Sequence, residues 1–168
     1  MAPQMLSLGI ERLQENMDYL AGLGIPREKL PAIIARVPQC LGLSSSRIQE
    51  TVDTVDKMFG EGAGVRALMR NSRIVMHNVN GIRRSFDYLS SLGMPKDRIE
   101  KCIRFIMRSV SGILRPRAQF LKAKGVDVVD DVTWILMSEE RFIKKCPDFA
   151  AYVTAYKARL KKKSKPKE

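Results

Sequence analysis

The sequence predicts an all-α protein, an α-solenoid of about four stacked helical repeats, and three observations carry this prediction. Apolar residues recur at helical spacing, whereas the alternating runs typical of strands are nearly absent. Four glycines, Gly24, Gly60, Gly93 and Gly125, follow one another at intervals of 36, 33 and 32 residues. Similar apolar sequence segments precede these glycines, which indicates a repeated unit of about 34 residues.

Each of these segments, together with its glycine, predicts the end of one helix and the start of the next. The two most similar copies are YLAGLGIP at residues 19–26 and YLSSLGMP at residues 88–95. Glycine after the last helical turn adopts the left-handed conformation without a steric penalty, and proline favours the first position of a helix. We therefore expect helices to begin directly after Pro26 and Pro95.

The second helix of each unit has its own signature, an arginine that follows an apolar pair. This position holds Arg36, Arg70 and Arg108 in the first three units, and we assign Ser138 to it in the last. A third helical stretch is expected near Ile48 and Ile82, so each unit should contain two longer helices with a short turn or 3-10 helix between them. The serines at 44–46 and Asn78 or Asn80, which precede those isoleucines, are suited to cap this third stretch.

Because one such unit cannot bury its apolar face alone, the units are expected to stack into an array over residues 1–156. The predicted units lie near residues 17–52, 53–86, 87–120 and 121–156. Residues 157–168 contain seven basic and one acidic side chain and are expected to form a disordered Lys-rich tail.

The charge balance favours a polyanionic partner. The chain has 30 Lys and Arg against 18 Asp and Glu, a formal net charge of +12. Residues 94–124 alone hold nine basic and two acidic residues. No apolar run approaches the length of a membrane span, so we expect no membrane partner. The N-terminus has no signal or transit pattern, so if the protein is imported we expect this sequence to be a trimmed form.

The residues do not favour catalysis, and we expect no enzymatic activity, metal or cofactor. His77 is the single histidine, without a serine or cysteine that would pair with it as a nucleophile. The three cysteines form no CxxC pair. The glycine-rich stretch at residues 60–64 lacks the Lys-Ser/Thr of a phosphate-binding loop, so it is interpreted as a connector.

The repeated arginines are the strongest candidates for binding. If the units stack in register, these guanidinium groups should line one strip and contact phosphates, although closing the helix ends is the alternative role. Charge reversal of Arg104 with Arg108 should then weaken binding more than reversal of Lys57 with Arg66. The predicted nucleic-acid-binding residues are Arg36, Arg70, Lys101, Arg104, Arg108, Arg115 and Arg117.

The phrase ending in Leu-Gly-[Ile/Met]-Pro, followed by a helix ending in Arg-x-Pro, resembles the repeat of the mitochondrial transcription termination factor (mTERF) family. Residues 114–125 and the closing segment at 134–156 carry the same resemblance, which covers residues 17–156. Ser72 and Val110 depart from it, because they occupy positions where the repeat has proline.

The resemblance implies a solenoid whose concave side binds nucleic acid in a mitochondrion or chloroplast. We therefore expect a non-enzymatic protein that binds double-stranded DNA or RNA through a basic groove and acts in transcription termination or regulation, or in RNA maturation. The alternative is a protein-interaction module that docks on an organellar ribosome or an RNA-modifying enzyme.

Overall fold

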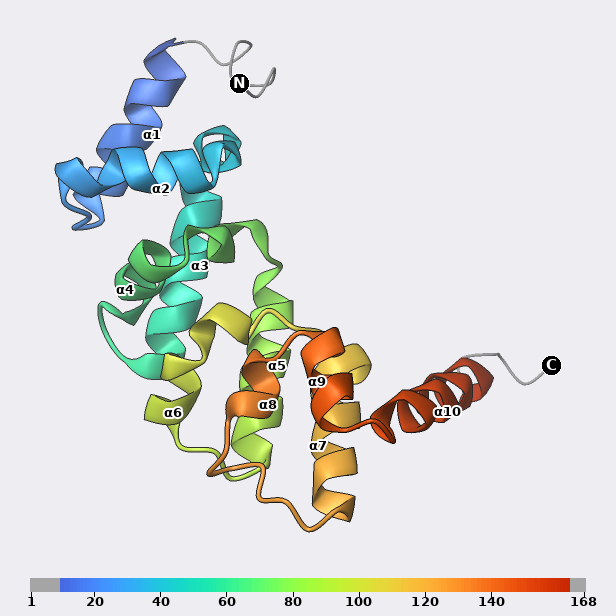
Figure 1. Ribbon diagram of the computed structural model, residues 1–168. Coiled ribbons are helices and arrows are strands. Elements are labelled where there is room, and N and C mark those ends of the chain that lie inside the picture. The colour runs from blue at the N-terminus through green and yellow to red at the C-terminus, as the bar shows by residue number, and fades with distance from the viewer. Residues whose placement is uncertain (1–9, 164–168) are drawn as a thin grey trace. The chain divides into compact units, whose positions relative to one another are not determined.

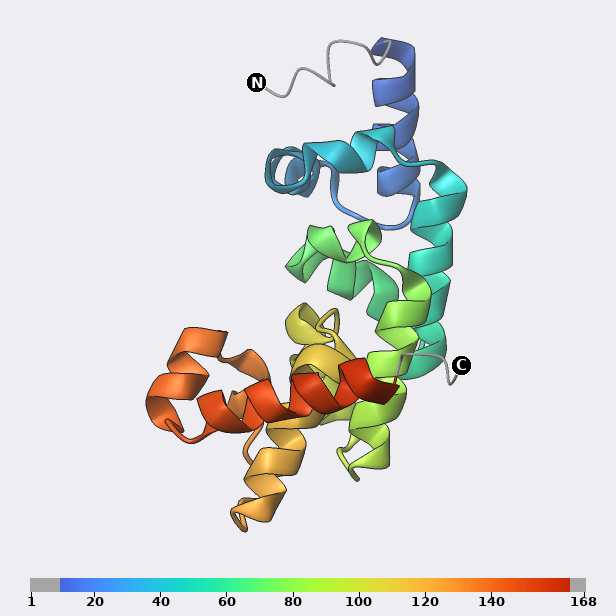
Figure 2. The same ribbon diagram turned by 90° about the vertical axis from the view of Figure 1, so that its right-hand side faces the viewer.

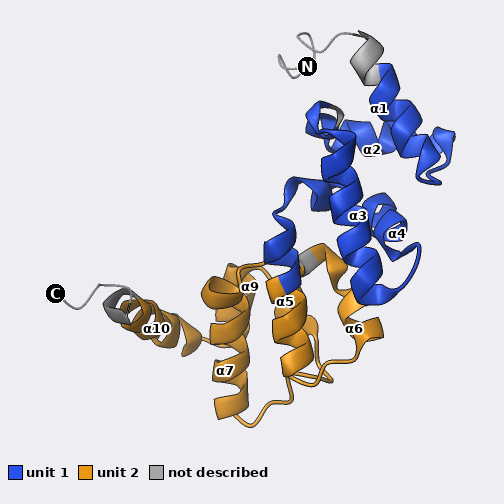
Figure 3. Cartoon of the chain, turned by 180° about the vertical axis from the view of Figure 1, so that it is seen from behind, with its two compact units in different colours: residues 1–83 blue, residues 84–168 orange. Residues whose placement is uncertain are grey.

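The computed structural model describes residues 10–163, and every regular element in that range is a helix (Figure 1). The predicted all-α class is therefore confirmed, since no strand forms within residues 10–163. The chain divides into two compact units, residues 1–83 and 84–168, each described separately below (Figure 3). Among residues 10–163, no helix combines the length and apolar character that crossing a membrane requires.

The first unit contains two copies of one pattern, a long helix, a shorter helix and a 3-10 turn. The first copy is α1 (Ile10–Gly22), the 3-10 turn η2 (Arg27–Lys29), α2 (Leu30–Arg36) and η3 (Pro38–Gly42). The second copy is α3 (Ser45–Phe59), α4 (Ala63–Arg70) and η4 (Ser72–Met76). This arrangement is the predicted repeat of two longer helices with a short helix or turn.

Burial confirms the repeat, because equivalent residues 34 positions apart are buried together. Ile48 in α3 and Ile82 are both fully buried, and Thr51 and Ser85 are buried polar residues with the same spacing. The same shift of 34 residues carries Arg36, the last residue of α2, onto Arg70, the last residue of α4. The two arginines therefore occupy equivalent positions.

Close packing of α4 along α3 holds the second copy together (Figures 1 and 2). Gly64 makes this approach possible, because a Cβ atom there would lie 2.5 Å from the carbonyl oxygen of Val52. The Gly64 N–H also donates a hydrogen bond of 2.6 Å to the Asp56 carboxylate.

The second unit begins inside α5 (Val79–Ser91), since the division falls after Arg83. It continues through α6 (Lys96–Lys101), the 3-10 turn η5 (Ile103–Phe105), the π-helical turn η6 (Val110–Leu114) and α7 (Arg115–Ala123). It ends with α8 (Thr133–Leu136), α9 (Glu139–Lys145) and α10 (Phe149–Lys163). α10 packs against both α7 and α9 (Figure 2).

The helix-end signals behave as predicted. Helices α1, α3, α5 and α7 are each followed, directly or after a short turn, by a glycine with a positive φ angle between 73° and 98°. These glycines are Gly24, Gly60, Gly93 and Gly125. The side chain of Ser44 accepts a hydrogen bond of 3.3 Å from the Arg47 N–H and so caps α3. At the start of α5, Asn78 accepts one of 2.8 Å from the Asn80 N–H.

The third repeat is shortened after its second helix. Buried residues of the first repeat match those of the third at a spacing of 69, for example Leu30 with Ile99 and Val37 with Ile106. The cap residues Ser44 and Ser109, however, are only 65 apart, so four residues are missing between these points.

The last unit differs from the prediction in register. α9 ends in Lys145, and the following Cys146 has φ −133° and ψ 79°, close to the −144° and 72° of Val37 after α2. Both residues precede a proline, so Lys145 is the equivalent of Arg36. Ser138, which was assigned to that position, instead caps α9 by accepting a hydrogen bond from the Arg141 N–H.

The limits of the units and the start of the tail also differ from the sequence-based expectation. The unit limits drawn after residues 52, 86 and 120 fall within α3, α5 and α7, because each of these helices continues almost to the glycine that follows it, Gly60, Gly93 or Gly125. The tail was expected to be disordered from residue 157, but α10 continues to Lys163. Residues 164–168 lie outside the described part.

Candidate functional site

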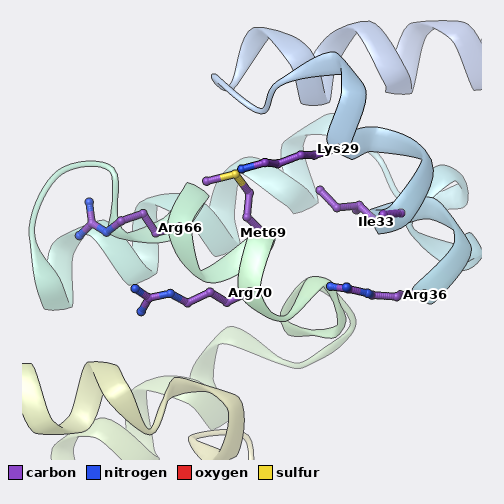
Figure 4. A pocket seen from close by; sticks show the side chains of 7 residues that line it. Lys29, Ile33, Arg36, Arg66, Met69 and Arg70 are labelled. Carbon is purple, nitrogen blue, oxygen red and sulfur yellow. The ribbon is translucent and has the colours of Figure 1, made fainter.

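A basic groove lies between the two repeats of the first unit. Its volume is about 430 Å³. It is lined by Lys29, Ala32, Ile33, Arg36, Arg66, Met69 and Arg70 (Figure 4). Four of these seven residues are cationic, three are apolar and none is acidic. We refer to this set of residues as the basic groove.

Helical spacing explains how the side chains reach the groove. Lys29 at the end of η2 is followed by Ile33 and Arg36 of α2 at spacings of four and three residues, which places all three on one face. On the opposite side, α4 contributes Arg66 and Arg70, four residues apart. Figure 4 shows Lys29 extending across the groove toward Met69 of α4.

The cationic groups of the groove are exposed to solvent. Lys29, Arg36, Arg66 and Arg70 are all exposed. Among the described residues, no carboxylate forms an ion pair with Arg36 or Arg70, and Arg66 donates a hydrogen bond of 3.3 Å to the Glu61 carbonyl. A guanidinium group can donate two parallel hydrogen bonds to one phosphate. The groove therefore has the charge and the donor geometry to hold a row of phosphates.

Arg36 and Arg70 were predicted to lie together, and the groove brings them together. Sequence reasoning did not select Lys29 or Arg66, and it expected charge reversal at Arg66 together with Lys57 to weaken binding less than reversal at Arg104 with Arg108. The signal that could have found both is their spacing: Lys29 is seven residues before Arg36, and Arg66 is four before Arg70. Each pair falls on one helical face.

Three predicted residues of the second unit are exposed. The Lys101 side chain is 78% exposed, and its ammonium group lies 3.8 Å from the Asp97 carboxylate of α6. Arg104 is exposed in η5. Arg115 is exposed at the start of α7, where its guanidinium carbon lies 5.4 Å from the centre of the Tyr88 ring. Their contact with nucleic acid stays a prediction.

Arg108 does not occupy the position that its sequence context suggested. The spacing of 69 residues makes Phe105, not Arg108, the equivalent of Arg36. Arg108 follows η5 in a turn, and its carbonyl accepts a hydrogen bond of 3.0 Å from the Ser85 hydroxyl. Partial burial lowers the pKa of its guanidinium group.

Arg117 is corrected by the structure, because it is a core residue. It is 2% exposed, and its guanidinium group donates hydrogen bonds of 2.9 and 2.8 Å to the carbonyls of Trp134 and Met137. The guanidinium carbon lies 4.6 Å from the centre of the Phe142 ring. Burial, with a smaller contribution from the charge of Arg108, lowers its pKa to about 10. This side chain joins α7 to α8 and α9 and has no surface to offer a phosphate.

Among residues 10–163, no three His, Cys, Asp or Glu side chains gather in a way that would hold a metal ion. His77 is half-buried, and desolvation lowers its pKa. Its carbonyl, not its imidazole, has the structural contact, accepting a hydrogen bond of 2.6 Å from Arg47.

The repeat pattern, the helix ends and the basic groove agree with one comparison. The profile of the mTERF family matches residues 1–143. The chain belongs to the mTERF family. Membership implies a helical-repeat protein of an organelle that binds nucleic acid, in a family that is generally non-enzymatic. None of the curated proteins compared with this mTERF chain matches it.

Proposed function

We propose that this mTERF protein binds the sugar-phosphate backbone of nucleic acid through its basic groove, in a mitochondrion or chloroplast, and so acts in transcription termination or regulation, or in RNA maturation. The observation that supports this proposal is the gathering of Lys29, Arg36, Arg66 and Arg70 around one groove without an acidic residue in its lining.

The physical basis is the exchange of counterions for protein cations. Each phosphate neutralised by Lys or Arg releases condensed cations, so affinity falls as salt rises. Contacts of this kind fix the register and orientation of a nucleic acid and carry little information about its sequence. The groove alone therefore supports positioning, and sequence preference requires contacts to bases elsewhere.

The test is a double substitution, R36A with R70A, measured by fluorescence anisotropy on a labelled duplex and a labelled single strand over a series of salt concentrations. Each lost phosphate contact should reduce the log–log salt slope by about 0.9 on a duplex or about 0.7 on a single strand. At about 0.1 M salt, two lost contacts weaken binding by about 60-fold on a duplex or about 25-fold on a single strand.

The matched control is K57A with R73A, which removes the same charge from exposed residues of the same unit that do not line the groove. The control should change affinity by much less than the groove variant, because these residues do not line the groove and attraction without direct contact is weakened by salt screening. Equal losses in the two variants would reject the groove, and no binding to any nucleic acid would favour the protein-interaction alternative.

A further inference from the structure

A second hollow, separate from the basic groove, lies within the second unit. Its volume is about 330 Å³, and it is lined by Arg84, Asp87, Tyr88 and Ser91 of α5 together with Val110 and Arg115. The four residues of α5 follow one another at spacings of three, one and three, so they lie on one helical face. The hollow thus combines two cations, one carboxylate and one aromatic ring.

Arg115 lies over the Tyr88 ring at this hollow. The guanidinium carbon of Arg115 lies 5.4 Å from the centre of the Tyr88 ring. Tyr88 is half-buried, and the Ser91 hydroxyl donates a hydrogen bond of 2.7 Å to its carbonyl. Burial raises the pKa of the Tyr88 phenol, which keeps the ring neutral. Unpaired nucleobases stack on aromatic rings and on guanidinium planes of this kind.

Asp87 narrows the class of base. Its carboxylate is exposed and makes no ion pair or hydrogen bond with another described residue, even though two arginines also line the hollow. An ionised carboxylate only accepts hydrogen bonds, so its best partner presents two adjacent donors. Guanine, with N1–H and the N2 amino group side by side, has such a pair on its Watson–Crick edge. Because that edge is occupied in a duplex, the base must be unpaired.

We propose that this hollow binds an unpaired guanine nucleotide, with the base against Tyr88 and Arg115, its N1–H and N2 amino group donating to Asp87, and its phosphate near Arg84. The cations alone would accept any nucleotide. The carboxylate repels phosphate and is favourable only when the base supplies donors, so it converts general attraction into a preference for guanine. The basic groove lacks such a group, since no acidic residue lines it.

The experiment compares four labelled seven-nucleotide RNAs by fluorescence anisotropy at low salt. The central residue of an otherwise all-uridine strand is guanine, adenine, inosine or uracil. Guanine should bind about tenfold more tightly than adenine, since a bidentate contact discriminates by about that factor. Inosine, which lacks the N2 amino group, should fall between them.

The variant D87N should abolish the preference for guanine, because an amide no longer offers two acceptors to the base. The matched control is D97N, which removes the same charge from an exposed acid of the same unit outside the hollow. Both variants should bind all four strands somewhat more tightly, but only D87N should lose the ratio of guanine to adenine affinity.

Three results would overturn this proposal: no preference for guanine, a preference that survives D87N, or no binding of any of the strands. The groove variant R36A with R70A separates it from the proposed function, since the affinity ratio should persist there even where overall affinity falls. Competition by GMP and not AMP would show that the free nucleotide suffices. Competition only by a guanine-containing strand would show that neighbouring phosphates contribute, and either result supports the hollow.

Discussion

Replacing Gly64 by alanine tests how closely α3 and α4 must pack to form the second repeat. A Cβ atom at this position would lie 2.5 Å from the carbonyl oxygen of Val52, 2.7 Å from its Cα atom and 2.9 Å from its carbonyl carbon. These distances are about 0.6 to 1 Å shorter than a favourable contact, which lies at about 3.5 Å. Because all three atoms belong to the backbone, no side chain can rotate away, and the two helices must separate.

The magnitude follows from two opposing effects. Overpacking a close helix contact costs about 1 to 3 kcal/mol, and separation also weakens the hydrogen bond of 2.6 Å between the Gly64 N–H and Asp56. Alanine favours a helix over glycine by about 1 kcal/mol, which offsets part of the cost. We expect G64A to lower the free energy of unfolding by about 2 kcal/mol.

The assay is urea denaturation followed by circular dichroism, with G81A as the control. Gly81 lies in α5, and a Cβ atom there would meet nothing within 4 Å. G81A should leave stability unchanged or raise it by up to about 1 kcal/mol. If G64A were as stable as the wild type, the close approach of α4 to α3 would be refuted, and with it the placement of Arg66 and Arg70 in the groove.

Three further predictions concern single residues. N71V should stabilise the protein by about 1 kcal/mol in the same denaturation assay. The buried Nδ2 of Asn71 has no hydrogen-bond partner among the described residues, and the equivalent residue of the first repeat, Val37, is apolar. If N71V were destabilising, an acceptor for Asn71 Nδ2 would have to be present. R117M should lower the free energy of unfolding by about 3 kcal/mol, since two backbone carbonyls lose their charged donor. Nucleic-acid affinity per folded molecule should stay unchanged. A weaker affinity without a loss of stability would indicate that Arg117 contacts phosphate after all. Burial lowers the pKa of His77 below the usual 6.5, so just below that pH the unfolded chain binds more protons than the folded protein. The free energy of unfolding should therefore fall as the pH drops through 6.5. In a thermal-melting series over pH, H77Q should show a smaller fall than the wild type.

Local signals in the sequence were sufficient to predict the helix ends. A glycine with positive φ and a serine whose hydroxyl accepts a backbone N–H depend only on residues within a few positions, so Gly24 and Ser44 could be assigned without knowledge of the fold. The same holds for the period of the repeat, because its apolar residues must recur whenever the same face is buried. The all-α class and the family follow from these features.

Register in the later repeats could not be assigned so simply. Arg108 follows an apolar pair just as Arg36 does, yet the buried neighbours Cys102 and Ile106 match Ile33 and Val37 at a spacing of 69, which makes position 105 the equivalent of position 36. The four residues missing before Ser109 shift the sequence match away from the packed positions. A pattern of residue types cannot distinguish the two alignments, whereas the set of side chains buried against the neighbouring helices does.

The sequence by itself determined where most helices end, how often the unit repeats and that cations are in excess. The tertiary structure decided which cations face solvent together. Arg117 and Arg36 are both helical arginines next to apolar residues, but carbonyls 17 and 20 positions further along the chain fold over Arg117 and bury it. Lys29 and Arg66 share a groove only because η2 and α4 contribute to the same surface. The physical reason is range: capping and backbone conformation are set by neighbouring residues, whereas desolvation and electrostatic potential depend on every atom nearby in space.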